Sequence, residues 1–296
     1  MKKDKNSSKK RTSRQHFDLD IPELAPGQQH PELAKVQTYL GRAGYLKEAY
    51  SSSRLDTPTQ KALKRFQRFR KLKQTGTTDP ATVERLKQPK CGYPDQTKRP
   101  RLSGAMAAAA PAALAPSLSI GCDYRPKTTL TYTFVNRTSD LGPNLNRVNN
   151  AIARAFATWQ AAIPINFVLV ADDDTANFKI GWFSGSHDDG DDFDSIGGVI
   201  AHAFGPPPCG DPHAGLCHFD EAEVWGNNHS PAPRMFDLET QALHEIGHLL
   251  GLSHSNDPNS IMFTDYRFVT NVAERRRLSP DVLTAIQSIY GSRTPS

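Results

Sequence analysis

The spacing of apolar residues changes along the chain. In the front third of the chain, this spacing has the period of a helix. Apolar side chains recur there every three or four residues, with basic and polar side chains between them. This spacing predicts three short helices: one over residues 31–43, one that begins at Asp56 or Thr57, and one that begins at residues 78–80. The front third is therefore predicted to be a small all-α unit.

From about residue 130 the pattern alternates between strand-like and helix-like segments. Residues 130–135, 167–170 and 178–182 are short runs rich in β-branched and aromatic side chains, which predict strands. Residues 148–160 place apolar side chains on one helical face, and a last helix is predicted over 279–290. This part of the chain is therefore predicted to contain both helices and strands.

Three histidines and a glutamate stand close together late in the chain. The run from His244 to His254 reads His-Glu-x-x-His-x-x-Gly-x-x-His. On a helix, His244 and His248 lie one turn apart on the same face, so both rings can reach one ion. Gly251 can adopt a positive φ at no steric cost, so the helix can end there and the chain can turn back. That turn would bring in His254 as a third ligand.

Three imidazoles at this spacing suit zinc. Zn²⁺ prefers four ligands, so three histidines leave one position for water, and the ion lowers the pKa of that water to about 7. Glu245, next to the first ligand, is placed to take a proton from the water. The plainer interpretation is an amphipathic helix with incidental histidines. It is disfavoured because three of the ten histidines of the chain fall within this one run.

Two further motifs flank the histidines in the order of a known family. Residues 89–95 read Pro-Lys-Cys-Gly-Tyr-Pro-Asp and resemble the cysteine-switch segment of matrixin zymogens, normally Pro-Arg-Cys-Gly-x-Pro-Asp. Residues 260–262, followed by Tyr266, resemble the methionine turn of metzincin proteases. From about residue 30 to about 291 the chain is therefore similar to the matrixins (matrix metalloproteinases), zinc proteases of the metzincin clan.

The resemblance implies a domain organisation. Residues 120–292 would form a metzincin catalytic domain of the α+β type, with a mixed, mostly parallel sheet and three helices. Residues 29–96 would form a small all-α, three-helix, peptidoglycan-binding-like prodomain that carries the cysteine switch. The basic residues 1–28 are expected to be disordered, and the Ala/Pro-rich stretch 97–119 is expected to be a linker open to activating cleavage.

The resemblance also implies roles for residues around the catalytic zinc. In a latent zymogen, the Cys91 thiolate would occupy the position of the water; a disulfide with Cys122 or an inert surface thiol are the alternatives. Lys90 replaces the usual Arg and lacks its bidentate fork, so a salt bridge holding the switch would be weaker. Met262 would form an apolar floor beneath the histidines, and Tyr266 would wall the substrate pocket.

Further metal sites are implied between residues 187 and 223. A structural zinc would have four ligands, namely His187, Asp189, His202 and His218. Calcium would be bound by three carboxylates and three backbone carbonyls, namely those of Asp194, Asp220 and Glu223 and of Ser195, Gly197 and Val199. The stretch before His218 is longer than usual in the family and could displace that ligand. Cys209 and Cys217 lie in it and could form a local disulfide.

Composition and charge indicate which partners and which cellular location the sequence allows. The net charge is +5, and the basic front half lacks interleaved aromatic residues and any nucleic-acid motif, so no nucleic-acid partner is predicted. No apolar run is long enough to span a membrane. The Lys-rich start is not followed by an apolar segment, so no standard signal peptide is visible, although the family resemblance favours an extracellular enzyme.

The predicted function is that of a latent zinc metalloendopeptidase, with Glu245 as general base and Zn²⁺ and Ca²⁺ as cofactors. A monomer is expected, with a protein or peptide substrate, an activating protease and, as a further candidate partner, a cell-wall glycan. Two alternatives remain open: a cell-wall-associated zinc peptidase, and an inactive cell-wall or matrix-binding scaffold. The presence of Glu245 argues against the scaffold, which has no use for a general base.

Overall fold

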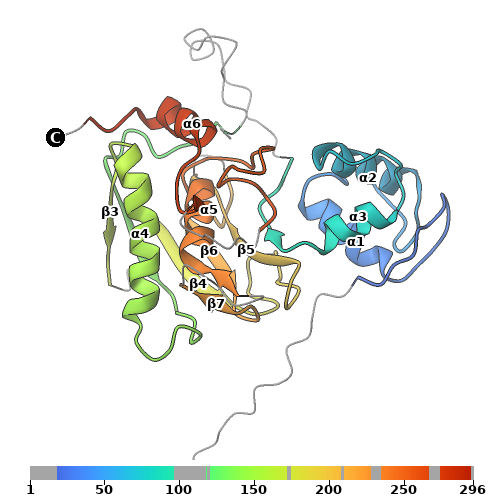
Figure 1. Cartoon of the computed structure of the whole chain (residues 1–296), viewed down its shortest axis with the longest axis horizontal. Helices are drawn as coiled ribbons and strands as arrows, with labels where there is room; N and C mark the ends of the chain where they lie inside the picture. Colours follow the sequence, from blue (N-terminus) through green and yellow to red (C-terminus); the bar gives the residue numbers. More distant parts are fainter. Residues whose placement is uncertain are drawn as a thin grey trace, which may run out of the picture.

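The chain folds into two units, each with its own buried hydrophobic cluster. The computed structural model describes residues 19–96, 118, 121–171, 175–207, 210–227, 235–266 and 274–294. In Figure 1 the helical front unit lies beside the larger unit that contains the sheet. This arrangement confirms the predicted fold class, a small all-α front unit followed by a unit with a mixed sheet and helices.

The front unit contains the three predicted helices. They are α1 (Leu33–Arg42), α2 (Thr57–Phe69) and α3 (Pro80–Lys87). The carboxylate of Asp56 accepts a hydrogen bond from the backbone N–H of the third residue of α2, and the carboxylate of Asp79 does the same for α3. Each cap satisfies an N–H that has no partner inside its helix, which explains where these two helices begin.

The segment before α1 belongs to the core of the front unit. Leu19, Ile21 and Leu24 are buried in the same hydrophobic cluster as the helices. The expectation that residues 1–28 are disordered is therefore wrong for residues 19–28, because these apolar side chains pack against the helices. The rest of that stretch lies outside the described residues.

The second unit is built on one six-stranded sheet in the order β1-β5-β6-β4-β2-β3. Its strands are β1 (Lys90–Cys91), β2 (Thr129–Phe134), β3 (Asn166–Leu169), β4 (Phe178–Phe183), β5 (Val199–Ala203) and β6 (Leu216–Asp220). Among the described strands of this sheet, only the pair β5–β6 is antiparallel. A short parallel pair, β7 (Trp225–Gly226) and β8 (Phe236–Asp237), stands apart from this sheet. The prediction of a mixed, mostly parallel sheet is confirmed.

In the described part of the chain, three helices accompany the sheet: α4 (Asn146–Ala162), α5 (Leu238–Leu249) and α6 (Pro280–Tyr290). Helix α4 packs against α5, and the indole N–H of Trp159 donates a 3.0 Å hydrogen bond to the Leu243 carbonyl. Trp159 is fully buried, so this contact fixes α5 against the core. Helix α5 carries the histidine motif and also contacts β5 and β6.

Strand β1 is the place where the front unit enters the sheet of the second unit. Along β5, the N–H of Lys90 donates to the Gly198 carbonyl and the N–H of Gly92 donates to the Ala201 carbonyl, both at 2.8 Å. On its other side, the Cys91 N–H donates to the Thr264 carbonyl at 3.0 Å. The switch segment therefore lies between β5 and the segment after the methionine turn, as Figure 1 shows for the small arrow next to β5.

The expected linker is described at one position only. Leu118 is buried in the core of the second unit, and its carbonyl accepts hydrogen bonds from Ser253. The rest of 97–119 lies outside the described residues. Within the described parts of the chain, no helix has both the length and the apolar character needed to cross a membrane.

Candidate catalytic metal centre

Helix α5 and the turn after it bring the three predicted histidines together. His244 and His248 lie one turn apart on α5, and Gly251 follows the helix with φ +96°. A Cβ at Gly251 would lie 2.3 Å from the carbonyl oxygen of Cys122, so no larger residue fits. The expected turn at this glycine is confirmed, and it places His254 beside the two helical histidines.

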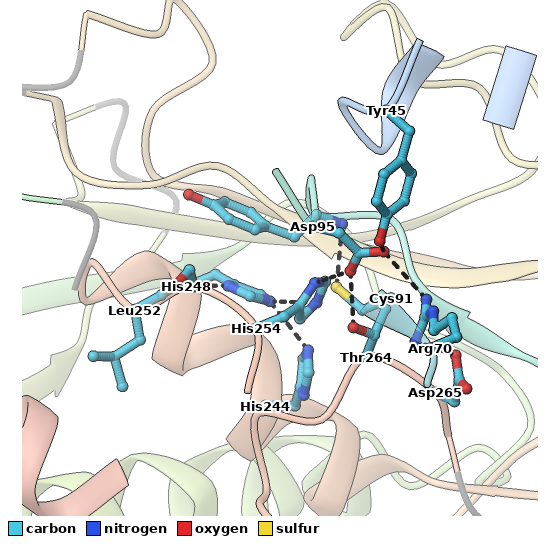
Figure 2. Close-up of polar contacts among 12 residues, drawn as sticks. Tyr45, Arg70, Cys91, Asp95, His244, His248, Leu252, His254, Thr264 and Asp265 are labelled. Atoms are coloured by element: carbon cyan, nitrogen blue, oxygen red, sulfur yellow. Dashed lines mark hydrogen bonds and ion pairs between the residues drawn. The ribbon is translucent and has the colours of Figure 1, made fainter. Parts of the chain in front are cut away.

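Hydrogen bonds on the outer side of two rings decide which nitrogen faces inward. The Nδ1 atoms of His244 and His248 lie 2.7 Å from the carbonyl oxygens of Ile261 and Leu252. Because a carbonyl only accepts, each Nδ1 carries the proton and each Nε2 presents a lone pair. The Nε2 of His248 lies 3.1 Å from that of His244 and 3.2 Å from that of His254 (Figure 2).

These residues fit a zinc ion. Lone pairs that converge at such distances repel one another unless a cation lies between them. Burial lowers the pKa of His244 to about 3 and that of His248 well below its usual value, so protons do not supply the charge. The three imidazoles and the Cys91 thiol offer ligand atoms within 4.8 Å of one another. A set of nitrogen and sulfur donors is the one that Zn²⁺ prefers.

Cys91 stands at the fourth corner of this group. Its side chain is buried, its Sγ accepts a 3.3 Å hydrogen bond from the Tyr93 N–H, and it lies 3.5 Å from Oε2 of Glu245. Burial and the Glu245 carboxylate raise the pKa of the thiol, whereas a divalent cation would favour the thiolate. The ring of Tyr93 stacks on that of His248 with centroids 3.9 Å apart.

The cysteines correct the disulfide expectations. Cys91 is free and Cys122 is disulfide-bonded, so the alternative that pairs these two is wrong. The alternative of a surface thiol is also wrong, because Cys91 is 3% exposed. Cys217 is a free buried thiol on β6, so the local disulfide between Cys209 and Cys217 does not form.

Asp95, the last residue of the switch motif, links the two units through its carboxylate. Its Oδ1 lies 2.8 Å from Nδ1 of His254 and accepts a 2.9 Å hydrogen bond from the Thr264 hydroxyl. Its Oδ2 accepts hydrogen bonds from the Tyr45 hydroxyl at 2.7 Å and from Arg70 at 3.2 Å (Figure 2). Burial by itself would raise the pKa of Asp95, but Arg70 and the contact with His254 hold it well below the usual range.

The arginine that contacts Asp95 is Arg70, which no motif of the sequence singles out. It lies 25 positions before Asp95, at the end of α2. The ammonium of Lys90 donates to the Leu86 carbonyl and lies 4.9 Å from the centre of the Tyr39 ring. Asp95 is thus paired with an arginine from another element of the front unit.

Glu245 is fully buried beside the histidines, and its two oxygens have different surroundings. Oε1 accepts a 2.7 Å hydrogen bond from the side-chain amide of Gln241, one turn earlier on α5. Oε2 faces Cys91. Burial raises the pKa of Glu245 to about 8, against the opposite effect of these two contacts. The spacing of four residues could have identified Gln241 from the sequence.

The methionine-turn residues lie under and beside the histidines. Met262 is fully buried, and a Cβ at Gly247 would lie 2.4 Å from its sulfur, so the sulfur packs on α5 between the two helical histidines. The hydroxyl of Tyr266 accepts a 2.7 Å hydrogen bond from the Asp237 N–H, and its ring contacts Phe236 edge-on. Tyr266 also lines a cavity of about 600 Å³ between the two units.

A second group of potential ligands comes from the loop after β4 and from within strands β5 and β6. His187 Nε2, His202 Nε2 and His218 Nδ1 lie 2.9, 2.8 and 2.7 Å from the same oxygen, Oδ2 of Asp189. His202 and His218 face each other in the β5–β6 ladder. The longer stretch between them therefore does not displace His218, and the four donors suit a closed tetrahedral zinc site.

The expected calcium ligands surround a loop that ends at β5. Asp194 Oδ1 accepts a 3.0 Å hydrogen bond from the Val199 N–H, and Glu223 accepts one from the Gly197 N–H. Asp220, the last residue of β6, is fully buried. Among the residues that the structure describes, these three carboxylates do not form a third group of mutually close ligand atoms.

Ser195, where the family usually has Gly, lies in the same loop with φ +75°, a left-handed conformation that favours glycine. Its carbonyl could still serve as a ligand, because a carbonyl belongs to the backbone of any residue.

Comparison with known proteins agrees with this geometry. The matrixin family model matches residues 123–291, and the model of a putative peptidoglycan binding domain matches residues 29–86. The chain is 35% identical over 274 residues to an interstitial collagenase of Equus caballus, covering 92% of this chain and 52% of the collagenase. It is 34% identical over 275 residues to metalloendoproteinase 1 of Glycine max, covering 90% and 84%.

The fold and the metal centre thus define a zinc-dependent peptidase. The chain belongs to the matrixin family of zinc metalloendopeptidases, with a front unit of the peptidoglycan-binding type. It spans about half the length of the horse collagenase and most of the length of the soybean enzyme.

Proposed function

We propose that this chain is a latent precursor whose processed form hydrolyses internal peptide bonds of proteins, with Glu245 as general base. The position of Cys91 carries the proposal. Its sulfur stands at the fourth corner of the three-histidine group and 3.5 Å from Oε2 of Glu245. A thiolate there excludes the water that hydrolysis needs, and it comes from a segment that cleavage in the linker can release.

In the processed form, different residues of the chain would have different roles in peptide hydrolysis. Bound zinc supplies Lewis acidity, which makes water a nucleophile near neutral pH. Glu245 takes the proton of the attacking water through Oε2 and delivers it to the leaving amine. Met262 keeps the underside of the site apolar, and Tyr266 walls the pocket beside it.

Release of the switch segment would also prepare a place for the substrate. Strand β1 occupies one edge of β5 and bonds on its other side to the segment around Thr264. Once β1 leaves, both rows of backbone groups are free to pair with an extended peptide. The scissile carbonyl would then lie near the position that the Cys91 sulfur takes in the latent form.

The second group of ligands would hold a structural zinc, because His187, Asp189, His202 and His218 close a tetrahedron and leave no position for a substrate. Asp194, Asp220 and Glu223 would bind calcium together with backbone carbonyls. We expect a monomer that acts outside the cell on protein substrates and is activated by another protease.

Proteolysis assays test this proposal. Full-length protein, cleaved with trypsin at the Lys/Arg stretch 98–101, should digest casein or a peptide library, and a chelator should stop the digestion. Glu245→Ala should retain zinc and lose turnover. A zinc-loaded processed protein without peptidase activity would contradict the proposal, and turnover by Glu245→Ala would contradict the role of the general base alone.

A cell-wall peptidase is the second candidate, because the front unit matches a peptidoglycan-binding model. A pull-down of the full-length protein with insoluble peptidoglycan separates the two functions. Retention on peptidoglycan, together with release of cell-wall peptides, would favour the second candidate. Absence of retention, with digestion of casein, would favour the first.

A further inference from the structure

The hydrogen bond between Gln241 and Glu245 gives the catalytic carboxylate a fixed orientation. Both side chains lie on α5 one turn apart, both are buried, and Gln241 Nε2 lies 2.7 Å from Oε1 of Glu245. An ionised carboxylate only accepts hydrogen bonds, so the amide must present its nitrogen. The bond lies within one helix, so it does not depend on the front unit.

We propose that Gln241 is a positioning residue that turns Oε2 of Glu245 toward the attacking water; this inference rests on the proposed function. Oε1 is held by the amide, and Oε2 is left facing Cys91, which occupies the position of the water in the latent form. Without the amide, the carboxylate can rotate about its last bond, and a buried acceptor loses its partner. The Glu245 carboxylate then points at the water in a smaller fraction of the molecules, whereas the contacts with the substrate are unchanged.

Substitution of Gln241 tests the proposal in the processed, zinc-loaded protein. Gln241→Met keeps the length and helix preference of the side chain and removes the donor. Its kcat is expected to fall at least about tenfold with KM and bound zinc unchanged, which corresponds to about 1.4 kcal/mol of barrier. The matched control is Gln287→Met on α6, which also loses an amide donor, to the Ala162 carbonyl, but lies away from the metal centre. Its kcat should stay at the wild-type value.

The outcomes separate this inference from the proposed function. Wild-type kcat in Gln241→Met, with Glu245→Ala inactive, would overturn the positioning role and leave the general base intact. Inactive wild-type protein would overturn the proposed function itself. If Gln241→Met does not fold, Gln241→Glu, which has the same shape but places a second carboxylate at Oε1, should lower kcat at least as much; an unchanged kcat in that variant would also overturn the inference.

A separate observation concerns the cation that holds the switch segment. The guanidinium of Arg70 contacts two carboxylates from different units, Asp95 at 3.2 Å and Asp265 at 2.8 Å, the latter as an ion pair without hydrogen-bond geometry. The side chains of all three residues are 1–3% exposed. Arg85 forms a second ion pair with Asp265 at 2.8 Å, so two arginines balance two aspartates (Figure 2 shows Arg70 between its carboxylates).

The position of Arg70 is set by the front unit. Its guanidinium lies 5.5 and 5.4 Å from the ring centres of Phe66 and Phe69 and donates a hydrogen bond to the Tyr39 hydroxyl. These contacts hold the planar group so that its two sides reach two acids, which an ammonium could not do. The other oxygen of Asp95 contacts His254, so the same carboxylate connects Arg70 to the third histidine of the metal centre.

We infer that Arg70 is the latency clamp of this protein: it fastens the switch segment to the catalytic unit through Asp95 and Asp265. Both of its acid partners are buried, so their attraction to Arg70 is weakly screened by salt. Removal of Arg70 leaves two buried carboxylates without their shared cation. The switch segment should then open more often and expose Cys91.

Thiol labelling of the zinc-loaded, full-length protein tests the clamp. In Arg70→Met, a maleimide should label Cys91 at least about tenfold faster than in wild type, with the site mapped by mass spectrometry against Cys217, and peptide hydrolysis should appear without processing. The matched control is Arg65→Met on α2, which removes a partly exposed ion pair with Glu48 and a hydrogen bond to the Tyr45 carbonyl but no contact with Asp95 or Asp265, and which should behave as wild type.

The proposal would be overturned if Cys91 were labelled at the wild-type rate in Arg70→Met, or if Arg65→Met accelerated the labelling of Cys91 equally. Should Arg70→Met fail to fold, Asp265→Asn removes the charge on the catalytic unit that pairs with Arg70 and Arg85. That variant should also accelerate Cys91 labelling, and an unchanged rate in it would count against the proposal.

Discussion

His254, the third histidine of the metal centre, lies with its Nδ1 2.8 Å from Oδ1 of Asp95, a residue of the switch segment. A carboxylate on the outer nitrogen fixes the ring and makes the inner nitrogen a better donor to a metal. The latent form therefore supports its metal centre with a side chain that leaves when the switch segment is removed.

Asp95→Asn should weaken zinc binding in the full-length protein. The amide retains the shape but loses the charge that supports His254, and loss of such an outer partner typically costs about 10–100-fold in metal affinity. Competition with a chromogenic chelator measures the affinity. Asp20→Asn, an exposed change in the front unit, is the control, and equal affinity in the two variants would show that Asp95 does not support the ligand.

Cys91→Ser should produce activity in the unprocessed protein. A hydroxyl is a far weaker ligand for zinc than a thiolate, so water can enter the fourth position. Peptide hydrolysis by uncleaved protein, with chain length checked on a gel, is the measurement. Cys217→Ser is the control because it removes the other free buried thiol. If Cys91→Ser stays latent, the switch mechanism fails.

The processed protein should contain about two zinc ions per chain. His218→Ala removes one donor from the group around Asp189 and should lower the content to about one, while His244, His248 and His254 keep the other ion. Loss of the structural ion should also lower the melting temperature, because metal binding contributes to folding free energy. Elemental analysis measures the number of zinc ions per chain. A value of one ion in the wild-type protein would contradict the second site.

Asp79→Ala should destabilise the front unit by about 1 kcal/mol at neutral pH through loss of the cap on α3. The carboxylate is partly buried, which raises its pKa, but hydrogen bonds from Thr75 and Thr82 outweigh this, so the pKa of Asp79 in the folded protein lies below its ordinary value. A lowered folded pKa means that the charged cap stabilises fully above the unfolded pKa, and that this contribution is lost as pH falls below it.

The measurement for Asp79 is the difference in unfolding free energy between wild type and variant. This difference should be constant near neutrality and should shrink on acidification below about pH 4. Thr38→Ala, an exposed residue of α1 whose hydroxyl donates to the Ala34 carbonyl, is the control, and its effect should show no such dependence on pH. A difference for Asp79→Ala that persists at low pH would show that the charge of the cap is not what stabilises α3.

Local patterns were sufficient for much of the fold and for the catalytic centre. The helices of the front unit and α4, α5 and α6 were predicted because apolar periodicity and caps such as Asp56 and Asp79 act within a few residues. The three histidines could be assigned because helix geometry and one glycine place them together. Strands β5 and β6 were not predicted, since the apolar alternation there is interrupted by their metal-site histidines.

The sequence by itself determined the class of the protein, its helices, and the ligands and general base that lie within one helical segment, because those relationships depend on contacts a few residues apart. Only the tertiary structure decided which cation holds Asp95, which cysteines are free, and that β1 pairs with β5. Arg70 and Asp95 come from different elements, and Asp265 lies 170 positions beyond Asp95. Such contacts arise from packing of whole units, which no local pattern of residues encodes.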